Sequence, residues 1–133
     1  MINPIIDFEQ ISALFQPLPR IVVIISELKE LMLDGTLLNE KMIINIAQKA
    51  CAAGIHLILL TDQPTYDVIT ELLRANIPTR LSFEVNTKAD SRKILDSSGA
   101  ELLTSEDMLF LPSDSDESKY LQPIFATQIG RAH

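Results

Sequence analysis

Two polar residues, Ser26 and Glu27, follow directly on a run of five β-branched residues at positions 21–25. A run this apolar predicts a strand that is buried on both faces, at the centre of a mainly parallel sheet. Substrates of open α/β sheets bind beyond the carboxyl ends of such strands, so both side chains fall where chemistry is done. The Glu27 carboxylate can accept a proton from water, whereas the Ser26 hydroxyl is neutral and holds a hard cation only weakly.

A second apolar run, residues 55–60, ends in the same way, with Thr61 and Asp62. Because parallel strands present their carboxyl ends at one edge of a sheet, these side chains are expected beside Ser26 and Glu27. No metal site is expected, because the chain has only two histidines and no ligand cluster at zinc spacing. Its single cysteine excludes an internal disulfide.

Strand-like and helix-like patterns alternate along the rest of the chain, and capping and breaking residues divide them. The expected helices cover 27–33, a segment capped by Asn39 and stopped by Gly54, a segment opened by Thr65, and 89–97 after a Thr87–Asp90 capping box. The expected strands are 21–25, 55–60, 81–85, 108–111 and an edge strand at 121–127. This alternation predicts an α/β fold of three layers, a mainly parallel sheet with helices on both faces.

Length and composition favour a single domain: the chain has 133 residues, of which 47% are hydrophobic. We expect a domain at 20–133, preceded by an N-terminal arm at 1–19 that is marked by three prolines. The formal charge of −7 and the scattered basic residues disfavour DNA binding by the isolated chain. No apolar run reaches the roughly 18 residues of a membrane span, so a cytoplasmic protein without a membrane partner is expected.

Six blocks of sequence within residues 17–112 together carry a specific signal. They are PRIVVIISELKELM (19–32), IAQKACAAGIHL (46–57), DVIT (67–70), ANIPTR (75–80), DSRKILD (90–96) and DMLFLP (107–112). In the right order and with nearly the right spacing, these blocks closely resemble the motor domain of the FtsK/SpoIIIE DNA translocases. The resemblance implies a RecA-like ATPase core. Members of this family use ATP and Mg²⁺, assemble as a ring that is usually a hexamer, and pump double-stranded DNA during chromosome segregation.

The chain departs from that family in its phosphate-binding parts. It contains no Gly-x-x-x-x-Gly-Lys-Ser/Thr phosphate loop, so it resembles only the C-terminal half of the motor, a truncated RecA-like core without a Walker A motif. Ser26 stands where the family's Walker B motif has its magnesium-linked Asp. Asp62 follows Thr61 where the family has a polar sensor amide, so this amide and a positive charge of the family's loop are lost.

The resemblance also implies roles for individual residues. Glu27 matches the catalytic base, here vestigial, and its other interpretation is an acid favoured by the first turn of a helix. Ser26, Thr61 and Asp62 match a vestigial nucleotide site. Arg92 or Arg80 could be the finger that reaches a neighbouring subunit's γ-phosphate. The alternative for Arg92 is a surface residue paired with Asp90 or Asp96.

Three functions fit these observations. The first is a non-catalytic relative of the motor that acts by protein association and modulates a translocase ring. The second is one part of an ATP-dependent DNA translocase whose phosphate loop lies on another chain or outside this sequence. The third is a decayed motor that folds and has no activity. No cofactor is expected in the isolated chain, and the expected partner is a second copy or an FtsK-like motor subunit. An incomplete sheet leaves an unpaired edge, which is expected to be filled by self-association or by the N-terminal arm around Pro4 to Phe8.

Overall fold

The computed structural model describes residues 19–34 and 37–124. The first part of the chain forms β1 (Ile21–Ile25), α2 (Leu28–Leu33), α3 (Leu37–Lys49), the 3-10 turn η1 (Cys51–Ala53) and β2 (Ile55–Leu59). The second part forms α4 (Glu71–Asn76), β3 (Arg80–Ser82), α5 (Lys88–Leu95), the 3-10 turn η2 (Ala100–Leu102), β4 (Met108–Leu111) and β5 (Lys119–Leu121). The expected arm at 1–19 lies outside the described residues, apart from Pro19.

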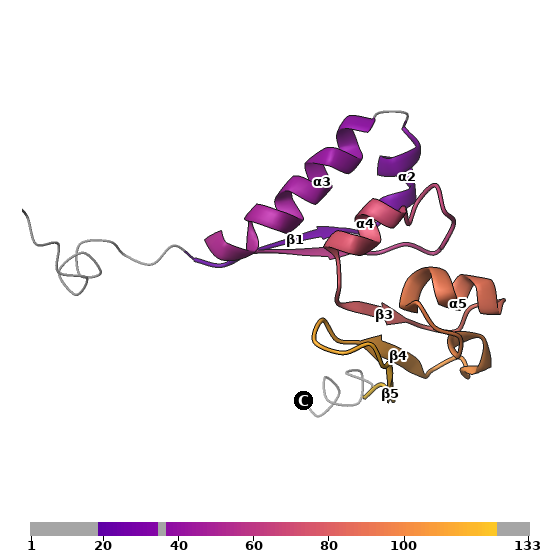
Figure 1. Ribbon diagram of the computed structural model, residues 1–133. Helices are drawn as coiled ribbons and strands as arrows, with labels where there is room; N and C mark the ends of the chain where they lie inside the picture. The colour runs from indigo at the N-terminus through magenta and orange to yellow at the C-terminus, as the bar shows by residue number, and fades with distance from the viewer. Residues whose placement is uncertain (1–18, 35–36, 125–133) are drawn as a thin grey trace, which may run out of the picture.

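Strands β1 and β2 form a parallel pair, in register from Ile21 opposite Ile55 to Ile25 opposite Leu59. Helices α2, α3 and α4 lie together over one face of this pair (Figure 1). Side chains from that face of the strands join the core beneath the helices. Its buried members are Leu28, Ile43, Ile44, Val68 and Leu73. The parallel pairing and the α/β class therefore agree with the pattern of the sequence.

The opposite face of the β1–β2 pair is bare among the described residues. Val22 and Ile24 of β1 are 55% and 61% exposed, and Ile58 of β2 is 45% exposed. Within the described residues β1 is therefore covered on one face only, which differs from the expected burial on both faces. The apolar run correctly indicates a strand, but burial depends on a covering layer, which the described residues do not supply.

The second half of the chain forms a separate sheet in the order β3–β4–β5, in which both pairings are antiparallel. Helix α5 packs against β3 and, with the turn η2, covers a small core of Leu95, Ala100, Leu103 and Leu111. The described strands thus form two sheets within the α/β fold, β1–β2 parallel and β3–β4–β5 antiparallel, and the pattern of the sequence did not indicate this division. Strand β5 ends at Leu121, and positions 125–127 of the expected edge strand lie outside the described residues.

The ends of the helices show which of the predicted capping residues cap a helix. Thr87 caps α5 by accepting a hydrogen bond from the Asp90 N–H, as the capping box predicts. Thr70, not Thr65, caps α4, and Thr65 instead begins a turn. Asn39 lies inside α3 and donates to the Leu31 carbonyl at the end of α2, so it does not cap α3. Among the described helices, none is both long and apolar enough to cross a bilayer.

Candidate functional site

The carboxyl ends of β1 and β2 are fastened together by two backbone hydrogen bonds. The Leu60 N–H donates to the Ile25 carbonyl at 2.9 Å, and the Leu28 N–H donates back to the Leu60 carbonyl at 3.0 Å. The second bond turns the chain from β1 directly into α2. Ser26 and Glu27, both exposed, therefore lie in a tight loop after β1, next to the carboxyl end of β2, as expected for parallel strands.

An open cavity of about 370 Å³ lies at these strand ends. Its lining residues are Glu27, Lys29, Glu30, Leu33, Asp62 and Gln63. Glu27 and Asp62, both singled out from the sequence, thus share one cavity although they lie in different loops. Ser26 and Thr61 adjoin it without lining it. The Thr61 hydroxyl is engaged locally, since it accepts from the Gln63 N–H at 3.2 Å.

Four of the six lining residues were not predicted from the sequence: Lys29, Glu30, Leu33 and Gln63. Gln63 lines the cavity and carries a side-chain amide. It lies one position after Asp62, which matches the family's sensor amide. Lys29, in the first turn of α2, contributes a positive charge. A signal for Gln63 was present in the sequence, because it is the one amide in the loop 61–63. A shift of one residue in the alignment would match it to the family's sensor amide.

The charges of this cavity decide which ligand it can take unaided. Three carboxylates, from Glu27, Glu30 and Asp62, outnumber the single ammonium of Lys29. This net negative charge is unfavourable to a nucleotide's phosphates, and the sequence contains no Gly-x-x-x-x-Gly-Lys-Ser/Thr loop whose backbone N–H groups would hold them. In the part of the chain that the structure describes, no group of three or more His, Cys, Asp or Glu residues is placed to hold a metal ion.

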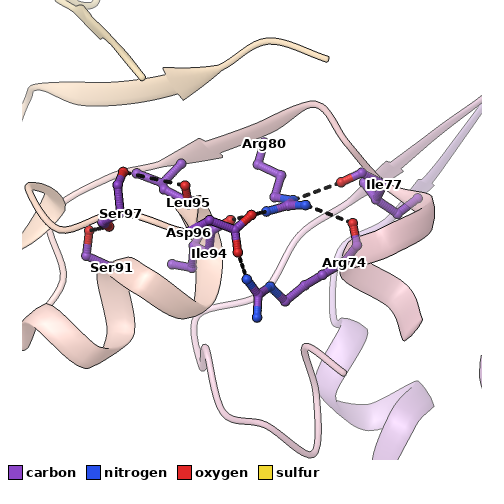
Figure 2. A network of polar contacts seen from close by, with 8 residues as sticks. All are labelled: Arg74, Ile77, Arg80, Ser91, Ile94, Leu95, Asp96 and Ser97. Carbon is purple, nitrogen blue, oxygen red and sulfur yellow. Dashed lines mark hydrogen bonds and ion pairs between the residues drawn. The ribbon is translucent and has the colours of Figure 1, made fainter. Parts of the chain in front are cut away.

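Arg80 is fully engaged inside the protein (Figure 2). Its guanidinium donates to the carbonyls of Ile77, Ile94 and Arg74 at 2.9, 3.2 and 2.8 Å and to the Asp96 carboxylate at 2.5 Å. Burial, and then the positive charge of Arg74, lower the pKa of Arg80 from its ordinary value. These contacts tie the end of α4 to β3 and to the end of α5, so every nitrogen of the side chain already has a partner.

Arg92, on α5, is exposed, and within residues 19–34 and 37–124 it makes no ion pair. The alternative that it pairs with Asp90 or Asp96 is wrong. Asp90 instead pairs with Lys93 at 3.3 Å, and Asp96 takes Arg74 and Arg80. Neither Arg92 nor Arg80 lines the cavity at the strand ends. The trans role of either arginine stays a prediction, with Arg92 the one whose guanidinium is available.

A larger cavity, of about 590 Å³, lies between the end of α5 and the loop that precedes β5. Its lining includes Asp116 and Glu117 and contains no basic residue. The cavity therefore offers no cationic side chain to a phosphate, and none of the residues singled out from the sequence lines it.

Comparison with solved structures defines the class of fold. The pCW3 conjugation coupling protein TcpA, solved as a monomer form with ATPgS, superposes with a TM-score of 0.69 at 26% identity, over 79% of this chain and 32% of that one. The cytoplasmic domain of the Thermomonospora curvata type VII secretion ATPase EccC gives a TM-score of 0.71 at 16% identity, over 86% of this chain and 13% of that one. The fold is part of a RecA-like ATPase core.

Sequence comparison narrows this class, although no family model matches the chain. The DNA translocase FtsK of Vibrio vulnificus (strain CMCP6) is 51% identical over 115 residues, which are 86% of this chain and 12% of that protein. FtsK 2 of Neisseria meningitidis serogroup A / serotype 4A (strain DSM 15465 / Z2491) is 50% identical over 113 residues, covering 84% and 11% of the two chains. The chain belongs to the FtsK family. It spans between 11 and 14% of the length of these curated relatives and their Streptococcus pyogenes counterpart.

Proposed function

We propose that this chain supplies the Walker B and sensor strands of an FtsK-type, ATP-dependent DNA translocase, and that the phosphate loop comes from another chain or from outside this sequence. One observation carries the proposal: Glu27 and Asp62 line one cavity at the ends of a parallel strand pair. About half of the residues are identical to those of DNA translocases over the matched length. The assembled motor would work in the cytoplasm, as a ring on double-stranded DNA.

The chain's own residues do not fit a nucleotide and Mg²⁺ by themselves. The lining is net negative, and Ser26 offers a neutral hydroxyl where the family has a carboxylate, which holds a hard cation more strongly. What the chain contributes is Glu27. Glu27 is exposed and lines the cavity, where its carboxylate can accept a hydrogen bond from a water molecule and orient that water. Binding of phosphate has to come from the complementary part.

The edge of β2 offers a docking place for that complementary part. In the parallel ladder, Ile21 donates to Gly54 and Leu60 donates to Ile25, so the backbone groups of Leu57 and Leu59 point away from β1. In the RecA-like sheet implied by the resemblance, the phosphate-loop strand lies beside the sensor strand, which is β2 here. A strand added at this edge would place the phosphate loop next to Asp62 and Glu27.

Complementation tests this function directly. The chain would be mixed with a segment that carries the phosphate-loop half of an FtsK relative, and ATP hydrolysis measured with and without duplex DNA. We expect DNA-stimulated hydrolysis that Glu27→Gln lowers by about 10²–10⁴-fold, the range for loss of a general base. Glu30→Gln is the matched control, because it removes a carboxylate from the same cavity without changing the Walker B position. A stable complex without hydrolysis would contradict the proposal.

A second function, modulation of an intact translocase ring without catalysis, is favoured by Ser26, which replaces the magnesium-linked carboxylate. In this case the chain docks at a subunit boundary and Arg92, exposed on α5, contacts the neighbour. An excess of the chain should then change the DNA-stimulated ATPase rate of an intact FtsK motor, and Arg92→Ala should remove the effect. No change at any ratio, with the chain shown to be folded, would exclude this function.

A further inference from the structure

The outer edge of β1 carries free backbone groups that point away from β2. Ile21 donates to the Gly54 carbonyl and Ile25 accepts from the Leu60 N–H, so the odd-numbered residues of β1 face its partner strand. By the alternation of a strand, the N–H and C=O groups of Val22 and Ile24 point outward. No other strand pairs with this edge within residues 19–34 and 37–124.

This edge lacks the features that protect edge strands. β1 has the sequence IVVII, with no lysine, no proline and no charge within it. Its five β-branched residues are strongly favoured in strands, and an apolar unprotected edge is a template for pairing with another strand. The side chains of Val22 and Ile24 also stand on the bare face of the sheet and are more than half exposed. A further strand could therefore form hydrogen bonds with the outward N–H and C=O groups of β1 and apolar contacts with these two side chains.

The charges at the two ends of β1 indicate which strand fits. Arg20 lies immediately before β1, and Ser26 and Glu27 lie immediately after it; all three are exposed. A second copy of β1 laid antiparallel and centred on Val23 would bring Arg20 of each copy beside Ser26 and Glu27 of the other. The positive charge of Arg20 then lies near the negative charge of the partner's Glu27. Because the arrangement is two-fold symmetric, this happens at both ends of the strand pair.

We propose that two copies of this chain pair through β1, forming a continuous four-stranded sheet with the order β2–β1–β1–β2. In this register Val22 of one copy lies opposite Ile24 of the other. Because both residues direct their N–H and C=O groups outward, they exchange two hydrogen bonds, and the symmetric pair exchanges two more. The four side chains form one apolar cluster on the bare face, continued on each side by Ile58 of β2.

This inference goes beyond the proposed function and uses the other edge of the sheet. Completion of the motor is proposed at the edge of β2, and self-pairing is inferred at the edge of β1. The dimer is measured without nucleotide, DNA or a phosphate-loop segment. Failure of complementation therefore leaves the dimer in place, and absence of the dimer leaves complementation untouched.

The first test is the mass of the full chain by analytical ultracentrifugation over a wide range of concentrations. We expect a monomer–dimer equilibrium, which Ile24→Lys weakens by about tenfold or more because it sets two like charges against apolar side chains at the edge. Leu102→Lys is the matched control, since Leu102 is an exposed leucine of η2, far along the chain from this edge. A monomer at every concentration, or a dimer that Ile24→Lys leaves unchanged, would overturn the proposal.

The second test fixes the register and does not depend on a variant that weakens the fold. In a Cys51→Ala background, Val22→Cys and Ile24→Cys are purified separately and then oxidised alone or as a mixture. Directly opposite residues of this type have Cα atoms about 5.5 Å apart, within the range of a disulfide. The mixture should give cross-linked heterodimers several-fold faster than either protein alone. Equal rates, or no cross-link in the mixture, would show that the strands do not pair in this way.

Discussion

Arg80 of β3 and the carboxylate of Asp96, at the end of α5, form an ion pair with a nitrogen–oxygen distance of 2.5 Å, and Arg74 of α4 reaches the same carboxylate (Figure 2). Two arginines therefore share one acid at the junction of the two halves of the chain. The Arg80 guanidinium also donates hydrogen bonds to three backbone carbonyls. Its place in the sequence resembles that of a catalytic arginine, yet its contacts are those of a residue that joins elements of the fold.

Replacement of the two candidate arginines should separate these roles. Arg80→Ala removes four hydrogen bonds of a partly buried guanidinium and should lower the free energy of unfolding by about 2–3 kcal/mol. Arg92→Ala, on an exposed side chain, should change it by less than about 0.5 kcal/mol. Urea unfolding followed by circular dichroism gives both values. Equal effects of the two substitutions would contradict the internal role of Arg80.

Two glycines should differ in their tolerance of a side chain. Gly54 has φ +79°, and an added Cβ would make an ordinary van der Waals contact with Arg20 Cγ at 3.8 Å. Gly99 has φ +137°, and an added Cβ meets Leu109 Cδ1 at 3.2 Å. Gly54→Ala should therefore cost about 1 kcal/mol and Gly99→Ala about 2–3 kcal/mol, since the second adds a steric contact to a rarer backbone conformation.

Thermal unfolding of both alanine variants measures this difference. Gly54→Asn is the control, because Asn tolerates the left-handed conformation better than Ala and should recover part of the loss. A Gly99→Ala variant as stable as the wild type would show that the turn before η2 can adopt another path.

The part of the candidate site that the sequence predicted depends on local order. Glu27 lies two residues after β1 and Asp62 three residues after β2. Parallel pairing alone brings strand ends together, so their proximity could be predicted without coordinates, whereas the cavity between them could not. The Thr87–Asp90 capping box was equally predictable, because it involves residues three positions apart. Gln63 was missed because its position in the cavity depends on how the loop turns at Thr61, through a hydrogen bond between the two residues.

The parts that the sequence did not predict depend on distant contacts. Periodicity reports which side chains are apolar, and it does not report strand direction, so the antiparallel course of β4 was not foreseen. The chain leaves α5 through a left-handed residue, Asp96, and passes through the turn η2 before β4, which runs antiparallel to β3. Similarly, Thr65 and Thr70 are both suitable helix caps. Thr70 was selected by its place beside α3, where its hydroxyl donates to Glu40.

Acid should destabilise the second half of the chain through two aspartates. The Thr87 hydroxyl holds the pKa of Asp90 below its ordinary value of 3.8, and the hydroxyls of Thr104 and Tyr120 do the same for Asp107. A depressed pKa in the folded state means that the stabilisation is complete above 3.8 and is lost as the pH falls through the folded values. The free energy of unfolding should thus be level above about pH 5 and decrease below 3.8.

A substitution at Thr87 tests the origin of this acid dependence. Thr87→Ala should cost about 1 kcal/mol near neutral pH through the lost helix cap, and it should make the decrease below pH 3.8 shallower. Thr87→Ser keeps the hydroxyl and should keep the slope. Denaturant unfolding at a series of pH values measures both. An unchanged slope in Thr87→Ala would assign the acid dependence to other carboxylates.

Restoring an acid at position 26 should strengthen the response of the complemented motor to Mg²⁺. Ser26→Asp adds a carboxylate at the end of β1, beside Glu27, and the affinity of oxygen-ligand sites for hard cations rises with the number of charged ligands. The Mg²⁺ concentration for half-maximal hydrolysis should therefore fall by about tenfold. Ser26→Asn, similar in size and neutral, should leave it near the wild-type value.

Calorimetric titration of Mg²⁺ into the complex provides a readout that is independent of turnover. If Ser26→Asp and Ser26→Asn behave alike in both measurements, position 26 does not lie at the metal, and the correspondence with the Walker B motif would fail at this residue.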